Sequence, residues 1–230
     1  MTLRSGSPTS RRVALALAMT GALTAARCKT TPTAPAVTVP SIKYEQKLSW
    51  ILQLEDQRIL KLPDTSPAPP PPPVQTGRKG AVAPPPPAPP APPDLTALLK
   101  DTEPRIRRRA ALAIGRVGLP DGIPGLSAAL ADADPEVRAM SAFALGLIGD
   151  KAAEAPLTPL LADPAPLVRG RAAEALGLID ATGAAAAIGK VAAEYGRSPA
   201  VSAMTPDDET WPAAPEAEAF KLAIFSLVRL

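Results

Sequence analysis

The chain of 230 residues has no histidine, a single cysteine and only seven aromatic residues (two Trp, two Tyr and three Phe). Without histidine it lacks the most common general base and a frequent zinc ligand. A single cysteine also excludes a disulfide within the chain. The sequence therefore predicts no catalytic residue, no metal site and no cofactor.

The excess of positive charge lies at the amino terminus. The formal net charge is +3, but the first 27 residues carry four arginines and no acidic residue. Of the 25 basic residues, 21 follow this segment, against all 22 acidic ones. Since the rest of the chain has no basic excess, we expect no nucleic-acid partner.

Residues 1–27 have the layout of a secretory signal peptide, with a basic stretch, an apolar run over 13–26 and small residues at its end. The apolar run is shorter than the roughly 20 residues that a lasting transmembrane helix requires. The sequence therefore predicts export to the cell envelope or periplasm.

This segment resembles a bacterial lipoprotein signal, in which the first residue after the cleavage site is a cysteine that receives lipid. Cys28 stands where that cysteine would be. The resemblance implies membrane attachment through Cys28 alone. Arg27 replaces the small residue that usually precedes such a cysteine, so conventional cleavage after Ala26, with Cys28 left as a free thiol, is the alternative.

The export segment is followed by two linkers that flank one helix. Residues 28–40 are polar and proline-bearing, which predicts an extended linker. Residues 41–62 predict an amphipathic helix that needs a partner surface. Residues 63–93 hold 15 prolines and predict a disordered spacer of polyproline II and coil; a polyproline ligand for an aromatic-lined groove is the alternative. The helix has its cap and apolar stripe at Ser41, Tyr44, Leu48, Ile51, Leu52 and Ile59.

The remainder of the chain contains an internal repeat of 31 residues. Segments that start at Pro104, Pro135 and Pro166 match column by column, and a second apolar pattern recurs after each of them, so that the repeat covers 94–195. Proline at the start and glycine at the end of the first pattern are typical of short helices. Because neither helix of a unit can bury its stripe alone, the sequence predicts an all-α fold, a short α-solenoid of stacked helical hairpins.

The pattern resembles the short HEAT-like repeats found in many bacterial proteins and in bilin lyases. The resemblance implies a scaffold that binds a protein or peptide partner without catalysis, because such arrays serve mainly as binding surfaces. It rests on the columns represented in one unit by Asp132, Pro135, Val137, Arg138, Ala142, Ala144, Leu145 and Gly146, and on their equivalents 31 residues away.

Charged residues and glycines recur in the same columns. We expect the arginine and aspartate columns to hydrogen-bond across units and to hold the stack together. A helix-interior glycine costs about 1 kcal/mol of helix propensity relative to alanine, so the glycine column predicts close approach of the paired helix. The columns are Arg107, Arg138 and Arg169, then Asp101, Asp132 and Asp163, and then Gly115, Gly146 and Gly177.

A local basic cluster on the first of these three segments has two interpretations. It is either a solvated face or a site for an acidic partner. Its members are Arg105, Arg108, Arg109 and Arg116.

The end of the chain departs from the period. Residues 196–214 predict a loop insertion, and 215–230 predict the first helix of an incomplete further unit. With no second helix to cover its apolar residues, we expect a longer protein of which this is the front portion. Exported bacterial proteins similar to this one can continue into a cyclophilin-type peptidyl-prolyl isomerase domain, so the alternative function is to present substrate to such a domain. The apolar residues are Phe220, Ile224, Phe225 and Leu227.

Overall fold

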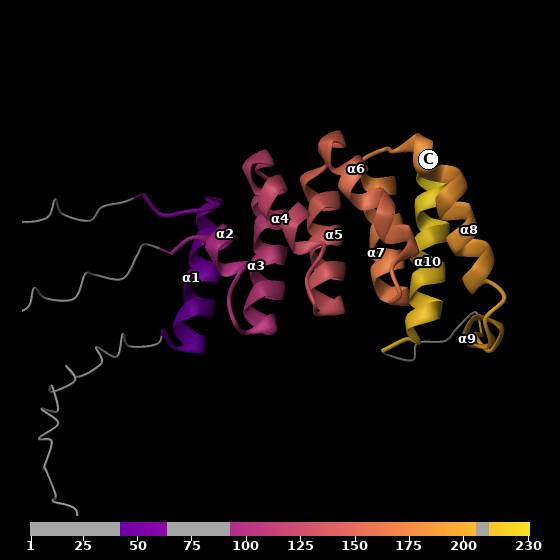
Figure 1. Ribbon diagram of the computed structural model, residues 1–230, viewed down its shortest axis with the longest axis horizontal. Helices are drawn as coiled ribbons and strands as arrows, with labels where there is room; N and C mark the ends of the chain where they lie inside the picture. Colours follow the sequence, from indigo (N-terminus) through magenta and orange to yellow (C-terminus); the bar gives the residue numbers. More distant parts are fainter. Residues whose placement is uncertain (1–41, 64–92, 206–211) are drawn as a thin grey trace, which may run out of the picture. The chain divides into compact units, whose positions relative to one another are not determined.

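The computed structural model describes residues 42–63, 93–205 and 212–230, and all regular elements in these ranges are helical (Figure 1). The described residues form the all-α solenoid that the repeat predicts. The predicted signal peptide, Cys28, the linker at 28–40 and all but the ends of that at 63–93 lie outside the described residues.

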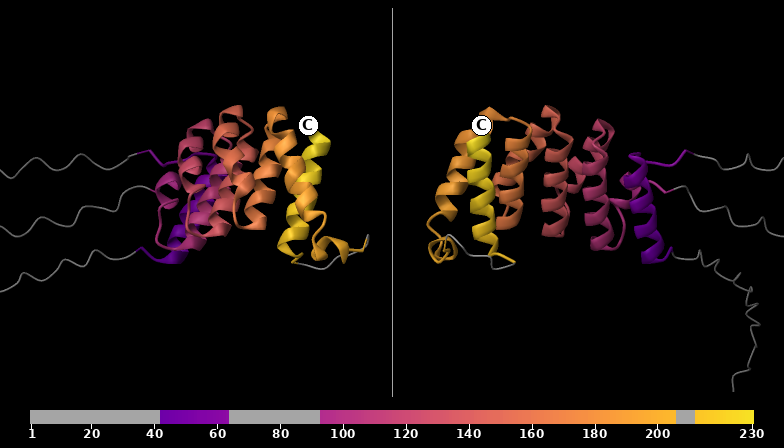
Figure 2. Two further views of the ribbon diagram at one scale, coloured as in Figure 1. Left: turned by 45° about the vertical axis from the view of Figure 1, so that its right-hand side comes forward. Right: turned by 180° about the vertical axis from the view of Figure 1, so that it is seen from behind.

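The first helices of successive units lie side by side in one layer (Figures 1 and 2). Each of them contacts the next one along the row. They are α1 (Tyr44–Gln57), α3 (Pro104–Val117), α5 (Pro135–Ile148), α7 (Pro166–Leu178) and α10 (Pro215–Arg229).

Shorter second helices follow the first helices of the first four units. Short 3-10 turns lead into three of them, at Pro120–Gly122, Lys151–Ala153 and Thr182–Ala184. The second helices are α2 (Leu95–Leu98), α4 (Ile123–Ala129), α6 (Glu154–Leu157) with its 3-10 continuation Thr158–Ala162, and α8 (Ala185–Tyr195). A further short helix, α9 (Pro199–Ser202), lies within the predicted loop insertion.

Helix α5 shows why these residues form short, well-bounded helices. Proline occupies its first position, and the carboxylate of Asp134 accepts a hydrogen bond from the backbone N–H of Glu136 at 2.8 Å. The helix ends where Gly149 adopts a φ of +77°, a left-handed conformation that glycine takes without steric cost. The sequence thus fixes both ends of the helix.

The helix predicted within 41–62 is α1, and it packs as the first helix of the array. Arg58 ends α1 in the left-handed conformation, with φ of +55°, just as Gly118 ends α3 with φ of +74°. These two residues are 60 apart. At the same offset, Leu54 of α1 and Ile114 of α3 are both fully buried. The partner surface of this helix is therefore α3.

Helix α2 lies beside the end of α1 and completes the first unit. The backbone N–H of Leu95 donates to the carbonyl of Leu60 at 2.8 Å, and that of Leu62 donates to Pro93 at 3.2 Å. Lys61 and Asp94 form an isolated antiparallel bridge. The proline-rich segment is consequently an insertion between the two helices of one unit, a relation that the sequence patterns did not reveal.

The buried face of α1 differs from the predicted stripe. Ile51 and Leu54 are fully buried, whereas Tyr44 and Leu52 are 37% and 54% exposed. The prediction was wrong for Tyr44 and Leu52, because the position of α3 selects the face that contains Leu54.

The glycine column allows close approach, but between the first helices of neighbouring units rather than within a unit. A Cβ atom added to Gly115 would lie 2.7 Å from the Cα of Ala144, and one added to Gly146 would lie 2.8 Å from the Cα of Ala175. Gly177 meets Ser226 of α10 in the same manner. Only a residue without a side chain permits this spacing of the first helices.

Helix α10 packs against α7 and α8. It is the final member of the row of first helices in the described residues. Phe220 and Leu227 are partly buried against the core, but Ile224 and Phe225 are 40% and 47% exposed, and Val228 is 82% exposed. The expectation that all the apolar residues of this helix lack cover was therefore wrong for Phe220 and Leu227, which α7 and α8 help to cover.

Candidate interaction surface

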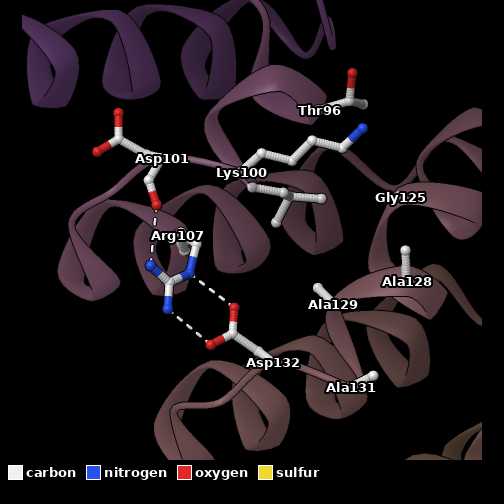
Figure 3. A pocket seen from close by; sticks show the side chains of 10 residues that line it. Thr96, Lys100, Asp101, Arg107, Gly125, Ala128, Ala129, Ala131 and Asp132 are labelled. Atoms are coloured by element: carbon white, nitrogen blue, oxygen red, sulfur yellow. Dashed lines mark hydrogen bonds and ion pairs between the residues drawn. The ribbon is translucent and has the colours of Figure 1, made fainter.

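The predicted arginine and aspartate columns meet and form paired rungs. The guanidinium of Arg107 donates two hydrogen bonds of 2.7 Å to the carboxylate of Asp132, and a third of 2.9 Å to the backbone carbonyl of Asp101 (Figure 3). Arg138 repeats the arrangement with two bonds of 2.9 Å to Asp163 and one of 2.9 Å to the carbonyl of Asp132. Each arginine therefore joins the ends of two successive second-helix segments.

Two further rungs extend this ladder, and the sequence reasoning missed the partner in both. Arg169 binds the carboxylate of Glu194 and the carbonyl of Leu161. Asp101 pairs with Lys47 of α1 at 2.6 Å. Glu194 follows Asp163 by 31 residues, so the aspartate column would have included it if glutamate had been allowed at that position as well. Lys47 carried no such signal, because the insertion displaces it from the period.

The two rungs formed by Arg107 and Arg138 are nearly buried, and their charges are paired. The side chains of Arg107 and Asp132 are 15% and 11% exposed. The hydrogen bond from Arg107 holds the pKa of Asp132 below its ordinary value, and the same bond raises the pKa of Arg107. Because each guanidinium is paired with a carboxylate, these side chains offer no unpaired charge to a ligand. The ladder therefore stabilises the stack.

A hollow of about 420 Å³ opens above the first internal rung, between α2 and α4 (Figure 3). Leu99, Ala128 and Ala129 give it an apolar lining, Thr96 lies on its wall, and Arg107 and its partners contribute to its lining. Lys100 is exposed and has no ion pair among the described residues. The hollow thus combines an apolar interior with one available ammonium group.

An equivalent hollow of about 500 Å³ lies two units further along, between the α6 segment and α8. Thr158, Leu161 and Arg169 line it, and each follows its counterpart in the first hollow by 62 residues, which is twice the period. Lys190, which is exposed, again supplies an ammonium group. The face formed by the second helices therefore presents the same type of hollow at two places, two units apart.

The basic cluster on α3 has acidic partners within the chain. Arg116 pairs with Glu55 of α1 at 2.7 Å, and Arg109 approaches the same carboxylate at 3.4 Å. Arg108 pairs with Glu136 of α5 at 3.3 Å. Three of the four arginines of the cluster therefore pair with carboxylates of the two neighbouring helices, α1 and α5.

No helix among the described residues has the length and apolar character needed to cross a bilayer. Across the same ranges, no three metal-ligating side chains gather into a possible ion site.

Comparison with known proteins detects HEAT-like repeat families in the array. Residues 123–204 match the family of HEAT repeats, and residues 106–132 match the PBS lyase HEAT-like repeat. A comparison with curated proteins finds no match.

Proposed function

We propose that this array of HEAT-like repeats is a scaffold, without catalysis of its own, that binds an extended protein or peptide segment along the face of the second helices. The observation that carries the proposal is the pair of equivalent hollows on this face, one in the first two units and one two units further. HEAT repeats commonly mediate protein interactions, and two equivalent hollows that lie two units apart suit a ligand that is itself extended.

The lining of the hollows indicates the chemistry of the partner. Leucine and alanine side chains suit an apolar residue of the partner, and the ammonium groups of Lys100 and Lys190 suit a carboxylate beside it. The arginines of the ladder are already paired and contribute shape rather than charge. The partner is therefore a segment in which apolar and acidic residues stand together.

The proposal places this scaffold in the cell envelope. Its support is the basic and apolar layout of residues 1–27, with Cys28 as the candidate site of lipid attachment. The intact mass of the protein recovered from a bacterial membrane fraction tests this placement. A mass that begins at Cys28 and includes acyl chains supports the tether, one that begins at Arg27 supports export without it, and an unprocessed amino terminus contradicts export.

The binding face can be tested by selecting peptides from a displayed random library against the whole chain. We expect the selected peptides to contain neighbouring apolar and acidic residues. Two variants then test the hollow between α2 and α4: Lys100→Glu reverses its charge, and Ala128→Trp fills it from an exposed position without adding charge. Each should weaken binding by about tenfold or more, since tenfold corresponds to ~1.4 kcal/mol, the range of one charge-assisted contact.

A matched control is Lys221→Glu, the same charge reversal at an exposed position on α10. It should leave the affinity of the selected peptides unchanged. If Lys221→Glu weakens binding as much as Lys100→Glu does, the interaction depends on overall charge and the assignment to the second-helix face is wrong.

A further inference from the structure

The interface between α1 and α3 is built differently from the other interfaces between first helices. Between α3 and α5, and again between α5 and α7, a glycine lets the backbones approach closely. At the offset of 60 residues, the position in α1 that corresponds to Gly115 is Glu55. A charged side chain therefore stands at the point where the other pairs of helices have their closest contact.

Ion pairs hold both ends of α1 to its neighbours. Glu55 binds Arg116 at 2.7 Å and Arg109 at 3.4 Å near the end of the helix, and Lys47 binds Asp101 at 2.6 Å near its start. The side chains of Lys47 and Asp101 are 16% and 10% exposed, but Arg116 is 50% exposed, and exposed ion pairs contribute little to stability and weaken with salt. The interface thus depends in part on contacts that water can replace.

The apolar contribution of α1 is small. Only Ile51 and Leu54 of this helix are fully buried. The face of α1 that points away from α3 is mostly polar, with Glu45, Ser49 and Asp56 exposed, but it also includes Leu52, which is 54% exposed. Among the described residues, α1 has a neighbouring first helix on one side, whereas α3, α5 and α7 have one on each side.

The chain connection also separates α1 from the rest of the array. Residues 64–92 stand between the last described residues of the α1 segment and α2. Beyond the side-chain contacts, two backbone hydrogen bonds join the α1 segment to α2, from Leu95 to Leu60 and from Leu62 to Pro93. The departure of α1 would therefore break few bonds outside its own interface.

We propose that α1 is a displaceable helix, which leaves and rejoins the array while α3, α5 and α7 stay folded, and that the groove it leaves on α2 and α3 binds amphipathic helices of the same residue order. That order is a basic residue, apolar residues four and seven positions later, and an acidic residue at the eighth, as in Lys47, Ile51, Leu54 and Glu55. Asp101 and the two arginines of α3 recognise the charged ends, and the apolar residues enter the core cluster to which buried residues of α2 and α3 belong. The partner class is thus a helix, in contrast to the extended segment proposed for the face of the second helices.

Hydrogen exchange of the whole chain tests the first half of this proposal. The amides of α1 should exchange together and at least roughly tenfold faster than those of α5, because local opening of a weakly held unit lies far below global unfolding. The variant Glu55→Gln should speed the exchange of α1 several-fold and leave that of α5 unchanged. Its control is Glu136→Gln, which removes an ion pair between α3 and α5 and should not affect α1. If α1 and α5 exchange at the same rate, the helix does not open by itself and the proposal is overturned.

The second half is tested with a fluorescent peptide that spans residues 42–63. Because α1 of the same chain competes for the groove, the apparent affinity of the peptide should scale with the open fraction. The peptide should therefore bind the Glu55→Gln chain more tightly than the unaltered chain, by the same factor by which exchange of α1 increases. A peptide with Leu54→Ala should bind at least roughly tenfold more weakly, because it loses a fully buried side chain. Equal affinity for the two chains would show that the peptide binds elsewhere, and no binding to either would overturn the groove.

Discussion

The close approach of α5 and α7 predicts an unusual response to a minimal substitution, Gly146→Ala. The new methyl group would lie 2.8 Å from the Cα of Ala175 and 3.0 Å from its Cβ, whereas ordinary contacts begin near 3.4 Å. The neighbour is backbone and cannot rotate away, so α5 and α7 must separate by about half an ångström. Overpacking of this kind costs about 1–3 kcal/mol, while alanine returns about 1 kcal/mol of helix propensity. We expect a net loss of about 1 kcal/mol.

Gly189→Ala is the matched control. Gly189 lies in the interior of α8, and nothing lies within 4 Å of an added Cβ atom there. The same substitution should therefore stabilise the protein by about 0.5–1 kcal/mol, through propensity and the reduced entropy of the unfolded chain. Both variants add the same methyl group to a helix, and they differ in the space that is available around it.

Urea unfolding followed by circular dichroism at 222 nm measures both variants, with the slope of each transition compared to that of the unaltered protein. The expected result is a lower midpoint for Gly146→Ala and a higher one for Gly189→Ala. A Gly146→Ala protein that is as stable as Gly189→Ala would refute the close approach of α5 and α7, and with it the role assigned to the glycine column.

Three further predictions concern single residues. Arg138→Ala should destabilise the array by about 3 kcal/mol in the same urea assay, since it leaves the nearly buried Asp163 unpaired; a loss under 1 kcal/mol would contradict the structural role of the rung. The hydrogen bond from Arg107 lowers the pKa of Asp132, so this carboxylate contributes stability that is present above its unfolded pKa of ~3.9 and is lost as the pH falls through the lower folded pKa. The variant Asp132→Asn should therefore be less stable than the unaltered protein at pH 7, and this difference in stability should shrink below about pH 4. A difference in stability that stays constant with pH would exclude this linkage. Arg58→Gly should raise the free energy of unfolding by about 0.5–1 kcal/mol, because φ of +55° strains arginine but not glycine, and an unchanged or lower free energy of unfolding would count against the left-handed cap.

The regular part of the fold could be predicted from the sequence because identical contacts demand identical residues. Arg107 and Arg138 meet their aspartates in the same geometry, so the columns that reveal the repeat are the contacts that hold it. The same logic failed where a different residue serves the same contact. Glu194 reaches Arg169 in place of an aspartate, and Lys47 replaces an arginine.

Helix α10 shows a second limit of the sequence pattern. Ser226 faces Gly177 as Ala175 faces Gly146, which fixes the register of α10 relative to the other first helices. In that register Phe220 takes the place of Arg169, and no rung forms there. The hollows were likewise absent from the pattern, because they depend on the spacing between second helices. The repeat period therefore predicts where the helices lie in the sequence, but the hollows between second helices become visible only in the three-dimensional structure.

The isolated backbone bridge between Lys61 and Asp94 affects how readily the segment between α1 and α2 can be lengthened or shortened. Both flanks of residues 64–92 return to one point at the edge of the first unit, where other units pass from Gly118 to Gly122 within a few residues. For a flexible segment whose ends already meet, each doubling of length adds about 0.6 kcal/mol of closure entropy. The position between α1 and α2 is therefore a natural point of insertion, at which evolution or a protein engineer could lengthen, shorten or replace a module while both described flanks keep their places.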